Sequence, residues 1–508
     1  MRGGGGALTY TLPYLSCDDT YPHAPKEKQR NATAKHNCHR PATLSDMDTT
    51  HKSGGTTTSH AHQKGPLWFR TPLAQTVTLG LVFFFVFSSY TTIQFYARTT
   101  YGPKLSADCV SCVYFTFTGA CLVAPAATNK WGSRRVLFWG VLGYASLVSA
   151  SLVYFIYGIK FIVILGGGIL GVGAALLWTG QGRLILDYAA VAPSQSGTLM
   201  GVFWAVFQCS AIVGGLITFL FYSESPSGGS VGLYVIFLCF IVVGALSTQL
   251  LLSPADLIRP QEMPESETTF LQAADTPSAP SLASVDTQPV ELAQPTTIST
   301  SSWYDEAKET LLLFWTRPMG LLSVLFFYTG FNQPYQQATF SNRFFSKRTI
   351  GLEMVIFHLF EIVGAMVIGR VLDKDRNGRR RSAMQCFLVF IAVNTTGNLS
   401  AWYQENQGRT EPVDIADFAS MLPSLSLALW GFADSLIQVY VYWLLGTIFE
   451  SSEDHSRAVG LYKCVQSLGV SIGFSLTPLT RLPALQQLAL SSTVYAMGTA
   501  LAFFQLPE

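Results

Sequence analysis

Five polar side chains lie within stretches of the sequence that are otherwise strongly apolar. Asp434 and Gln438 are four residues apart in one stretch, and His358 and Glu361 are three residues apart in another. Lys463 stands at the start of a third. Either spacing places two side chains on one face of a helix. Because a charge in apolar surroundings is costly unless it is paired or neutralised, these residues are candidates for binding a proton or a small ion.

Each of these side chains also has a structural interpretation. Lys463 could extend its ammonium group to an aqueous surface and leave only its aliphatic stem among apolar groups. Asp434 could fasten one helix to the next by a hydrogen bond, and Glu361 could pack against polar groups of its own half of the chain. Asp434 and Lys463 lie on consecutive predicted helices, so a direct ion pair between them is a further alternative.

Uncharged polar side chains gather in two further apolar stretches. Gln94 follows several Ser and Thr residues in one of them, and Asn332 and Gln333 precede Pro334 in the other. Such side chains either line a polar route or join helices by hydrogen bonds. Gln94, Asn332 and Gln333 are therefore candidate cavity residues.

Long apolar stretches must position all of these groups. Hydrophobic residues make up 49% of the 508 residues and charged residues only 12%, about half the charged share of a typical soluble chain. A helix needs about twenty mostly apolar residues to cross a bilayer. Twelve stretches qualify, at 73–95, 109–127, 136–157, 161–178, 199–222, 231–252, 319–340, 350–368, 383–402, 419–449, 461–476 and 484–504. The prediction is an all-α, polytopic membrane protein with about twelve transmembrane helices in a lipid bilayer.

A polar segment divides these stretches into six and six. Rich in Pro, Ser, Thr, Gln and Glu, it is predicted to be a disordered cytosolic linker at 253–307, because it lacks the apolar residues needed for a core. The six-helix halves are then 71–252 and 308–508, and residues 1–70 form a disordered tail. The loops on the side of the N-terminus hold 14 Lys and Arg, and those on the other side hold 8. Both termini are therefore predicted to face the cytosol.

Composition and motif searches argue against several other classes. The 32 Lys and Arg residues nearly balance the 31 Asp and Glu residues, so nothing indicates a nucleic-acid surface. Cys109-x-x-Cys112 has no second pair and opens an apolar helix, which favours packing over a metal or redox site. The sequence has no nucleophile elbow and no cluster at metal-ligand spacing. We expect neither an enzyme nor a metal or other cofactor.

Two loops at equivalent places in the halves follow one scheme, G-x-x-x-D-[RK]-x-G-x-[RK]-[RK]. The first copy, without the leading Gly and with Asn for Asp, contains Asn129, Lys130, Gly132, Arg134 and Arg135. The second, with two extra residues, contains Gly369, Asp373, Lys374, Gly378, Arg379 and Arg380. The scheme resembles the inner-loop signature of the major facilitator superfamily. There the Gly permits close helix approach, and the acidic group pairs with an Arg or a helix N-terminus to lock one conformation. Short inner loops are often basic, so the recurrence in both halves is the stronger signal.

Longer stretches resemble the UNC93-like family within that superfamily, closest to its plant and fungal branch. The C-terminal ones are Gly431-Phe-Ala-Asp434-Ser-Leu-Ile-Gln438, Tyr442-Trp443 and Ser456-Arg457-x-x-Gly460-x-Tyr462-Lys463-x-x-Gln466-Ser467-x-Gly469. The N-terminal ones are Gly173-Ala-Ala-Leu-Leu-Trp178-Thr-Gly-Gln181-Gly182 and Gly201-Val-Phe-Trp204-Ala-Val-Phe-Gln208. The likeness covers roughly residues 70–505 without the linker. It implies a major-facilitator-type fold in a family linked variously to potassium-channel regulation, ion homeostasis and receptor trafficking.

Two functions remain open. The first is a transporter that rocks two halves around a central cavity and moves a small ion or solute; the paired loops and the charges of Glu361 and Asp434 support it. The second is a non-transporting partner, either an ancillary subunit of an ion channel or a trafficking companion of membrane proteins. The family resemblance supports this alternative, and so does Asn129, which cannot supply the charge of the motif's Asp. We favour the transporter.

Overall fold

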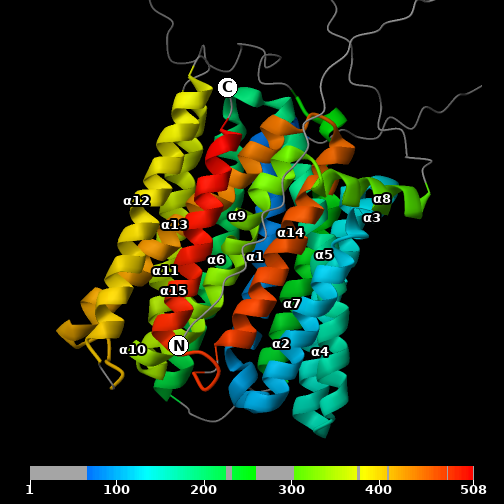
Figure 1. Ribbon diagram of the computed structural model, residues 1–508. Helices are drawn as coiled ribbons and strands as arrows, with labels where there is room; N and C mark the ends of the chain where they lie inside the picture. Colours follow the sequence, from blue (N-terminus) through cyan, green and yellow to red (C-terminus); the bar gives the residue numbers. More distant parts are fainter. Residues whose placement is uncertain are drawn as a thin grey trace, which may run out of the picture. The chain divides into compact units, whose positions relative to one another are not determined.

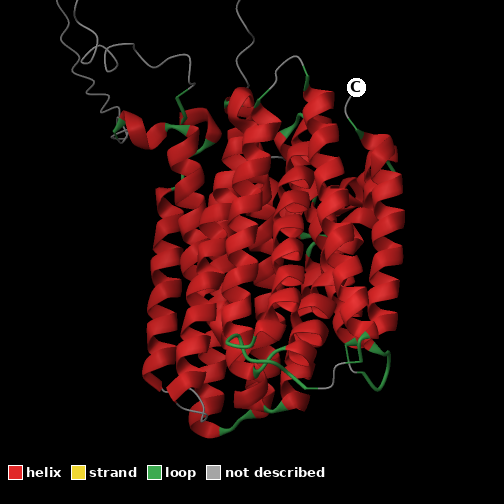
Figure 2. Cartoon of the chain, turned by 90° about the vertical axis from the view of Figure 1, so that its left-hand side faces the viewer, coloured by secondary structure: helices red, strands yellow, loops and turns green. Residues whose placement is uncertain are grey.

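The computed structural model describes residues 66–224, 231–258, 302–374, 378–408, 411–477 and 479–506. These residues are almost entirely helical, and among them there is no strand, only an isolated bridge between Phe345 and Val413. Figure 2 shows long helices that run side by side with short connections at their ends. Residues 1–65 of the predicted N-terminal tail and most of the predicted linker lie outside the described residues, whereas Leu67–Arg70, at the end of the predicted tail, form a short 3-10 helix.

The helices of the first half surround an aromatic core. They are α1 (Pro72–Tyr101), α2 (Pro103–Ala120), α3 (Ala124–Trp131), α4 (Ser133–Tyr157), α5 (Lys160–Val191), α6 (Ser196–Glu224) and α7 (Val231–Ser247). The short helix α3 continues α2 after a bend of 58°. The buried Phe83 ring packs edge-on against Trp178 and Phe203, so rings from α1, α5 and α6 meet in this half.

The second half begins with a short helix that lies across the bundle. Its helices are α8 (Trp303–Phe314), α9 (Arg317–Gln333), α10 (Ser341–Phe344), α11 (Lys347–Asp373), α12 (Arg379–Asn406), α13 (Met421–Ile448), α14 (Ser452–Leu476) and α15 (Ala484–Ala502). α8 makes an angle of 82° with α9 and α10, and Figure 1 shows it beside α3 at the upper end of the bundle. Residues Pro334–Phe340 join α9 to α10 as a π-helix. Pro334 has no N–H to donate to the preceding turn, which permits this wider turn.

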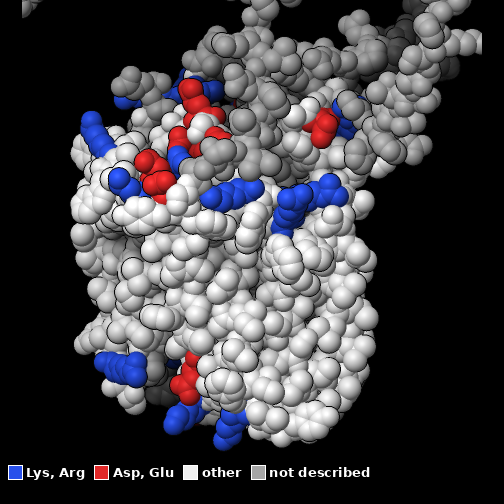
Figure 3. All heavy atoms as spheres, turned by 90° about the vertical axis from the view of Figure 1, so that its right-hand side faces the viewer, with Lys and Arg blue, Asp and Glu red and all other residues white. Residues whose placement is uncertain are grey.

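Each of the twelve predicted spans coincides with helical structure. Eight described helices are long and apolar enough to cross a bilayer, and ten are if each bent pair counts as one span. The remaining two, α12 and α14, have 28 and 25 residues, which is enough to span about 30 Å. Polar side chains lower their hydropathy. In Figure 3 the charged side chains gather towards two ends, with an uncharged band between them.

Two helices extend well beyond the predicted spans, and a third begins inside the predicted linker. α5 continues past the predicted end at 178 as far as Val191, and α14 begins at Ser452 instead of 461. Polar residues in these extensions break the apolar pattern, but the other half of the chain supplies their partners. α8 begins at Trp303, inside the range 253–307 predicted as linker. The Ser302 hydroxyl caps it by accepting a hydrogen bond from the N–H of Tyr304.

The two halves approach most closely where α6 crosses α11. A Cβ atom on Gly369 would lie 2.6 Å from the carbonyl oxygen of Gly197, and a Cβ on Gly201 would lie 2.4 Å from that of Ala365. Both distances are too short for any side chain, so glycine sets the separation of the helices here. Gly369 thus has the packing role predicted from its loop motif.

Candidate functional site

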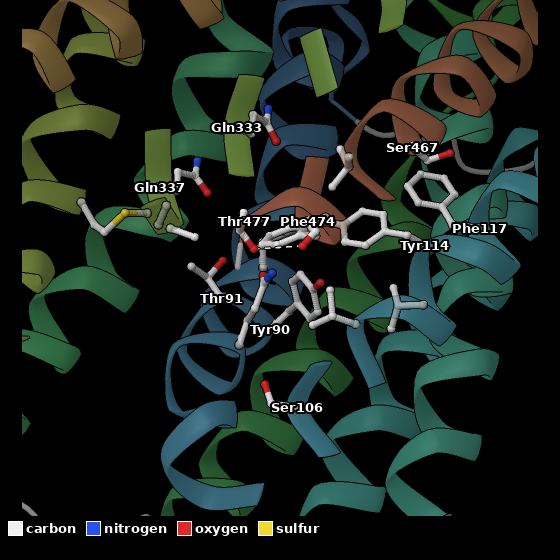
Figure 4. Close-up of a pocket in the computed structure, with 18 of the residues that line it drawn as sticks. Tyr90, Thr91, Ser106, Tyr114, Phe117, Gln333, Gln337, Ser467, Phe474 and Thr477 are labelled. Atoms are coloured by element: carbon white, nitrogen blue, oxygen red, sulfur yellow. Dashed lines mark hydrogen bonds between the residues drawn. The ribbon is translucent and has the colours of Figure 1, made fainter. Parts of the chain in front are cut away.

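A cavity of about 1830 Å³ lies between the two halves. Its walls come from α1, α2, α4, α5 and α6 on one side and from α9 to α11, α13 and α14 on the other. Figure 4 shows Tyr90 and Tyr114 of the first half in the same space as Gln333 and Phe474 of the second. Lys347 and Arg481 line one end of the cavity, which we call the mouth end of the bundle. The opposite end, with Asn129 and Asp373, is the motif end.

Most of the predicted cavity residues border this cavity, and the residues of the two loop motifs do not. The lining residues among them are Gln94, Gln333, His358, Glu361, Asp434, Gln438 and Lys463. Asn332 is also buried, but it is not part of the lining. It lies close to Tyr328 and interacts with the hydroxyl of that residue. The structure thus brings together in one place groups from α1, α9, α11, α13 and α14.

Asp434, Glu361 and His358, which we call the carboxyl cluster, lie together at the inner part of the cavity. All three side chains are almost completely buried. Nδ1 of His358 is hydrogen-bonded to Oε2 of Glu361, and the Asp434 carboxyl is within hydrogen-bonding reach of Glu361 and Gln438. Two carboxyls can hydrogen-bond to each other only if one of them carries a proton. The arrangement is therefore a site at which a proton can be held between α11 and α13.

Lys463 does not form the direct ion pair with Asp434 that the sequence suggested as one alternative. Among the described residues, no carboxylate oxygen lies within 4.0 Å of its Nζ. Nζ donates instead to Oε1 of Gln466 at 2.7 Å. Four aromatic rings surround it, and the nearest centroid, that of Trp178, is 4.4 Å away. The side chain is buried and lines the cavity, so its ammonium group does not extend to the bundle surface.

At the motif end, a hydrogen-bond network joins the two halves around Asn129. Its Oδ1 accepts from Ser456 at 2.7 Å and from Nη1 of Arg183 at 3.1 Å. Its Nδ2 donates to Oε2 of Glu306 at 3.0 Å, and the same carboxylate oxygen pairs with Arg457 at 3.0 Å. Asn129 lacks a charge, but Glu306 of α8 places a carboxylate directly beside it. The first loop motif therefore retains a charged partner, supplied by a different segment of the chain.

Two more contacts close the same end. The Asp187 carboxylate on α5 accepts from Ser452 at 2.6 Å and bonds to Nδ1 of His455 at 2.8 Å, both at the start of α14. The Asp373 carboxylate accepts from the backbone N–H groups of Gly197 and Thr198, each at 2.7 Å. These N–H groups begin α6, so Asp373 lies at the positive end of a helix dipole. The motif's acidic residue thus lies at a helix N-terminus, and its role in locking one conformation stays a prediction.

The other residues of the two loop motifs have simpler surroundings. Gly132 has a φ of 81° between α3 and α4, a conformation that favours glycine. Lys130 lies over the ring of Trp303, 5.2 Å from its centroid, and Arg134 contacts Gln249. The side chains of Arg135, Lys374, Arg379 and Arg380 are exposed. Gly378 precedes α12 and has a negative φ, a conformation that does not require glycine.

At the mouth end, basic side chains border the cavity. Arg343, Lys347 and Arg481 are part of its lining. Nε of Arg343 lies 3.0 Å from the carboxylate of Glu405. The nearby loop after α12 is tied to the start of α11 by Asp414, whose carboxylate accepts from the hydroxyls of Ser346 and Thr349. A backbone hydrogen bond from Ala416 holds the pKa of Asp414 below its usual value.

Sequence reasoning missed two sets of residues. The first is the network at the motif end, Arg183, Asp187, Glu306, His455 and Arg457. Arg183 and Asp187 are four residues apart and directly follow an apolar stretch, a pattern that indicates one charged helix face. The second set is the aromatic residues around Lys463, namely Trp178, Trp204, Tyr442 and Tyr462. These belong to the quoted family stretches, but their spacing alone does not reveal a common target.

Comparison with known proteins agrees with this geometry. The family model described as "Ion channel regulatory protein UNC-93" matches residues 108–504. The chain belongs to the UNC-93 family. UNC93-like protein 1 of Arabidopsis thaliana is 27% identical over 86% of this chain and 91% of its own length. An UNC93-like protein of Schizosaccharomyces pombe is 25% identical over 74% of this chain and 71% of its own. The resemblance predicted from the sequence, including plant and fungal members, is confirmed.

Solved structures show which fold this family member has. A major facilitator superfamily transporter, FucP, in its outward conformation aligns with a TM-score of 0.58 at 12% identity, over 86% of this chain and 99% of that one. The human organic anion transporter MFSD10 aligns with a TM-score of 0.53 at 13% identity, over 85% and 98%. The predicted fold is thereby confirmed: the chain is a multi-pass integral membrane protein of the major-facilitator type.

Proposed function

We propose that this UNC-93 family member is an alternating-access transporter that moves a small solute together with a proton. The observation that carries the proposal is the carboxyl cluster, which faces the cavity between the halves. Insertion of a charged residue in mid-bilayer costs about 2.5–3.5 kcal/mol. Two carboxyls and an imidazole in mutual contact therefore suit a site that gains and loses a proton.

Alternating access also requires one end of the bundle to be closed while the other is open. The cavity lining includes residues of the mouth end and none of the motif-end network. Contacts of Asn129, Asp187 and Asp373 across the halves hold the motif end closed. The excess of basic residues in the loops at the motif end favours placing that end in the cytosol. The arrangement supports an outward-facing state, from which rocking of the halves would break the network and open the cavity inwards.

Proteoliposomes that contain only this protein provide the test. With a pH-sensitive dye inside, solutes of different classes are added outside, and solute uptake and internal pH are recorded together. We expect one class to enter with a proton. Glu361→Gln should lower this coupled uptake at least about tenfold. Glu353→Gln is a matched control on the same helix, because Glu353 is also buried but does not line the cavity. Coupled uptake in Glu361→Gln equal to that of the unaltered protein, or solute uptake by the unaltered protein without any change in internal pH, would contradict the proposal.

Regulation of an ion channel is a second candidate function, and the description of the matching family model favours it. On this alternative, the cavity and the carboxyl cluster would serve stability or the docking of a membrane-protein partner. The two functions differ in a property of the isolated protein. A transporter moves solute in liposomes without a partner, whereas a regulator changes only the currents of a co-reconstituted channel.

A further inference from the structure

The ammonium group of Lys463 lies deep in the cavity among aromatic rings from four helices. Its Nζ is 4.4 Å from the ring centroid of Trp178 (α5) and 4.6 Å from that of Tyr462 (α14). The centroids of Tyr442 (α13) and Trp204 (α6) follow at 5.5 and 5.7 Å. Cation–π contacts offset part of the cost of burying the charge. An ammonium has three N–H donors, and among the residues that the structure describes one acceptor lies within reach of them, Oε1 of Gln466.

The net charge of the cavity lining differs between the mouth and the inner part. The charged side chains nearest the mouth are Asp108, Arg343, Lys347 and Arg481, of which Arg343 is paired with Glu405. Basic groups are therefore in excess where a solute enters, and such an excess draws in anions. Deeper in, Lys463 contributes a positive charge when it is protonated, and the carboxyl cluster contributes one negative charge when its two carboxyls share a single proton. The inner level is then close to neutral.

From these contacts we infer that the cavity binds a small organic anion with a flat apolar body, whose carboxylate or sulfonate is received by Lys463. The Trp178 and Trp204 rings are stacked with centroids 5.9 Å apart. Phe87, Tyr144 and Phe207 line the cavity beside them. These rings provide apolar surface for the body of the anion. Such an anion would be the solute of the proposed transporter. The linkage between anion binding and proton binding rests on that proposed function.

The same charges predict how the anion and the proton influence each other. The titratable and charged groups that face Asp434 are Glu361 and His358 on α11, Lys463 and Tyr462 on α14, and Tyr328 on α9. When an anion occupies Lys463, the negative charge of the carboxyl cluster has no counter-charge. Uptake of a second proton by the cluster removes this charge, so anion and proton strengthen each other's binding. Affinity for the anion should rise as pH falls, by up to about tenfold per pH unit for one linked proton.

Three probes of one shape and different charge test the site on the purified full chain in nanodiscs. They are benzenesulfonate, benzyl alcohol and benzylamine, and the readout is quenching of tryptophan fluorescence at equilibrium between about pH 5.5 and pH 8. Benzenesulfonate stays ionised over this range, so any pH dependence belongs to the protein. We expect it to bind at least about tenfold more tightly than benzyl alcohol, and benzylamine to bind most weakly. Equal or tighter binding of benzylamine overturns the inference.

Variants test whether Lys463 causes the preference for benzenesulfonate over benzyl alcohol. Lys463→Met should abolish the advantage of benzenesulfonate over benzyl alcohol, and Lys463→Arg should keep most of it. Lys374→Met is a control, because Lys374 is exposed at the motif end. Unchanged preference in a folded Lys463→Met protein refutes the site. If that variant does not fold, the comparison of the three probes on the unaltered protein still tests whether the cavity prefers an anion.

The binding result and the flux result are separable. Selective anion binding through Lys463, without proton-coupled flux, supports the anion site and contradicts the proposed transport. Proton-coupled flux of an uncharged or cationic solute, without selective binding of benzenesulfonate, supports the transporter and contradicts the anion site.

Discussion

At the scale of single residues, the charges in the bundle interior divide into two kinds. Arg183 and Asp187 lie at the motif end and have several partners with ordinary hydrogen-bond distances. The Asp434 carboxyl has fewer, since its Oδ1 has no hydrogen-bond partner among the described residues. Buried polar groups are normally satisfied, so such an atom beside a cavity is available to a proton or a solute.

We predict that Asp434→Asn preserves folding and removes proton-linked activity. Asn keeps the shape and the hydrogen-bonding capacity of the side chain but cannot exchange a proton. The melting temperature should change by no more than about 2 °C, since about 1 kcal/mol shifts it by about 2–4 °C in a domain of 150–250 residues and by less in a longer chain. Coupled uptake should fall at least about tenfold. Thermal unfolding and flux are measured on the same preparation.

The double variant with Lys463→Met separates a functional role from a structural one. If Asp434 and Lys463 stabilise the fold through their opposite charges, each single variant loses stability and the double variant regains part of it. A functional role leaves all three similarly stable and inactive. Full activity of Asp434→Asn would remove this residue from the site.

At the scale of elements, α8 links the segment between the halves to the closed motif end. Four of its residues, Trp303, Tyr304, Leu311 and Leu312, are exposed apolar or aromatic side chains, whereas Glu306 is buried. Through Glu306 the helix contacts Asn129 of the first half and Arg457 of the second. A helix that bonds to both halves at the same end stabilises the conformation in which that end is closed.

We therefore predict that Glu306→Gln shifts the population towards a motif-end-open state. The substitution removes the charge that pairs with Arg457, and hydrogen bonds to charged groups contribute about 1.5–3 kcal/mol. The equilibrium should shift by roughly tenfold or more. Spin labels at the exposed positions 135 and 374, one in each half, report the change as longer distances. Glu309→Gln on the exposed face of α8 is the control. Identical distance distributions for the two variants would refute the role of α8.

At the scale of the whole molecule, the charge distribution favours one orientation in the membrane. Most Lys and Arg residues of the predicted loops lie on the side of the motif end. On the face drawn in Figure 3, a band without charged side chains separates the two charged ends. From the positive-inside rule we predict that the motif end faces the cytosol and the mouth end the other side.

Cysteine labelling in intact cells tests this orientation. In a background without other accessible thiols, Thr480→Cys at the mouth end should react with a membrane-impermeant maleimide, since Thr480 is exposed. Lys374→Cys at the motif end should react only after the cells are permeabilised. The reverse pattern would invert the topology and turn the open cavity of this structure towards the cytosol.

The sequence alone determined which segments lie in the membrane and which loops recur. Apolar length and loop charge are local properties, so twelve spans, Gly369 at a close helix contact and Asp373 at a helix terminus were all predictable. The same holds for the candidate carboxyls Asp434 and Glu361, because an acidic residue is conspicuous within an apolar helix.

Only the tertiary structure decided the partners of these residues. Lys463 was a candidate partner of Asp434 in the sequence, yet its Nζ lies among four rings from four helices, and Asp434 meets Glu361 instead. Asn129 had lost the charge of its motif, and Glu306, far away in the chain, supplies a carboxylate beside it. Most of these contacts join residues that are far apart in the chain, by as many as 285 positions. Helical periodicity relates only neighbours on one helix, so the packing of the two halves determines every contact between them.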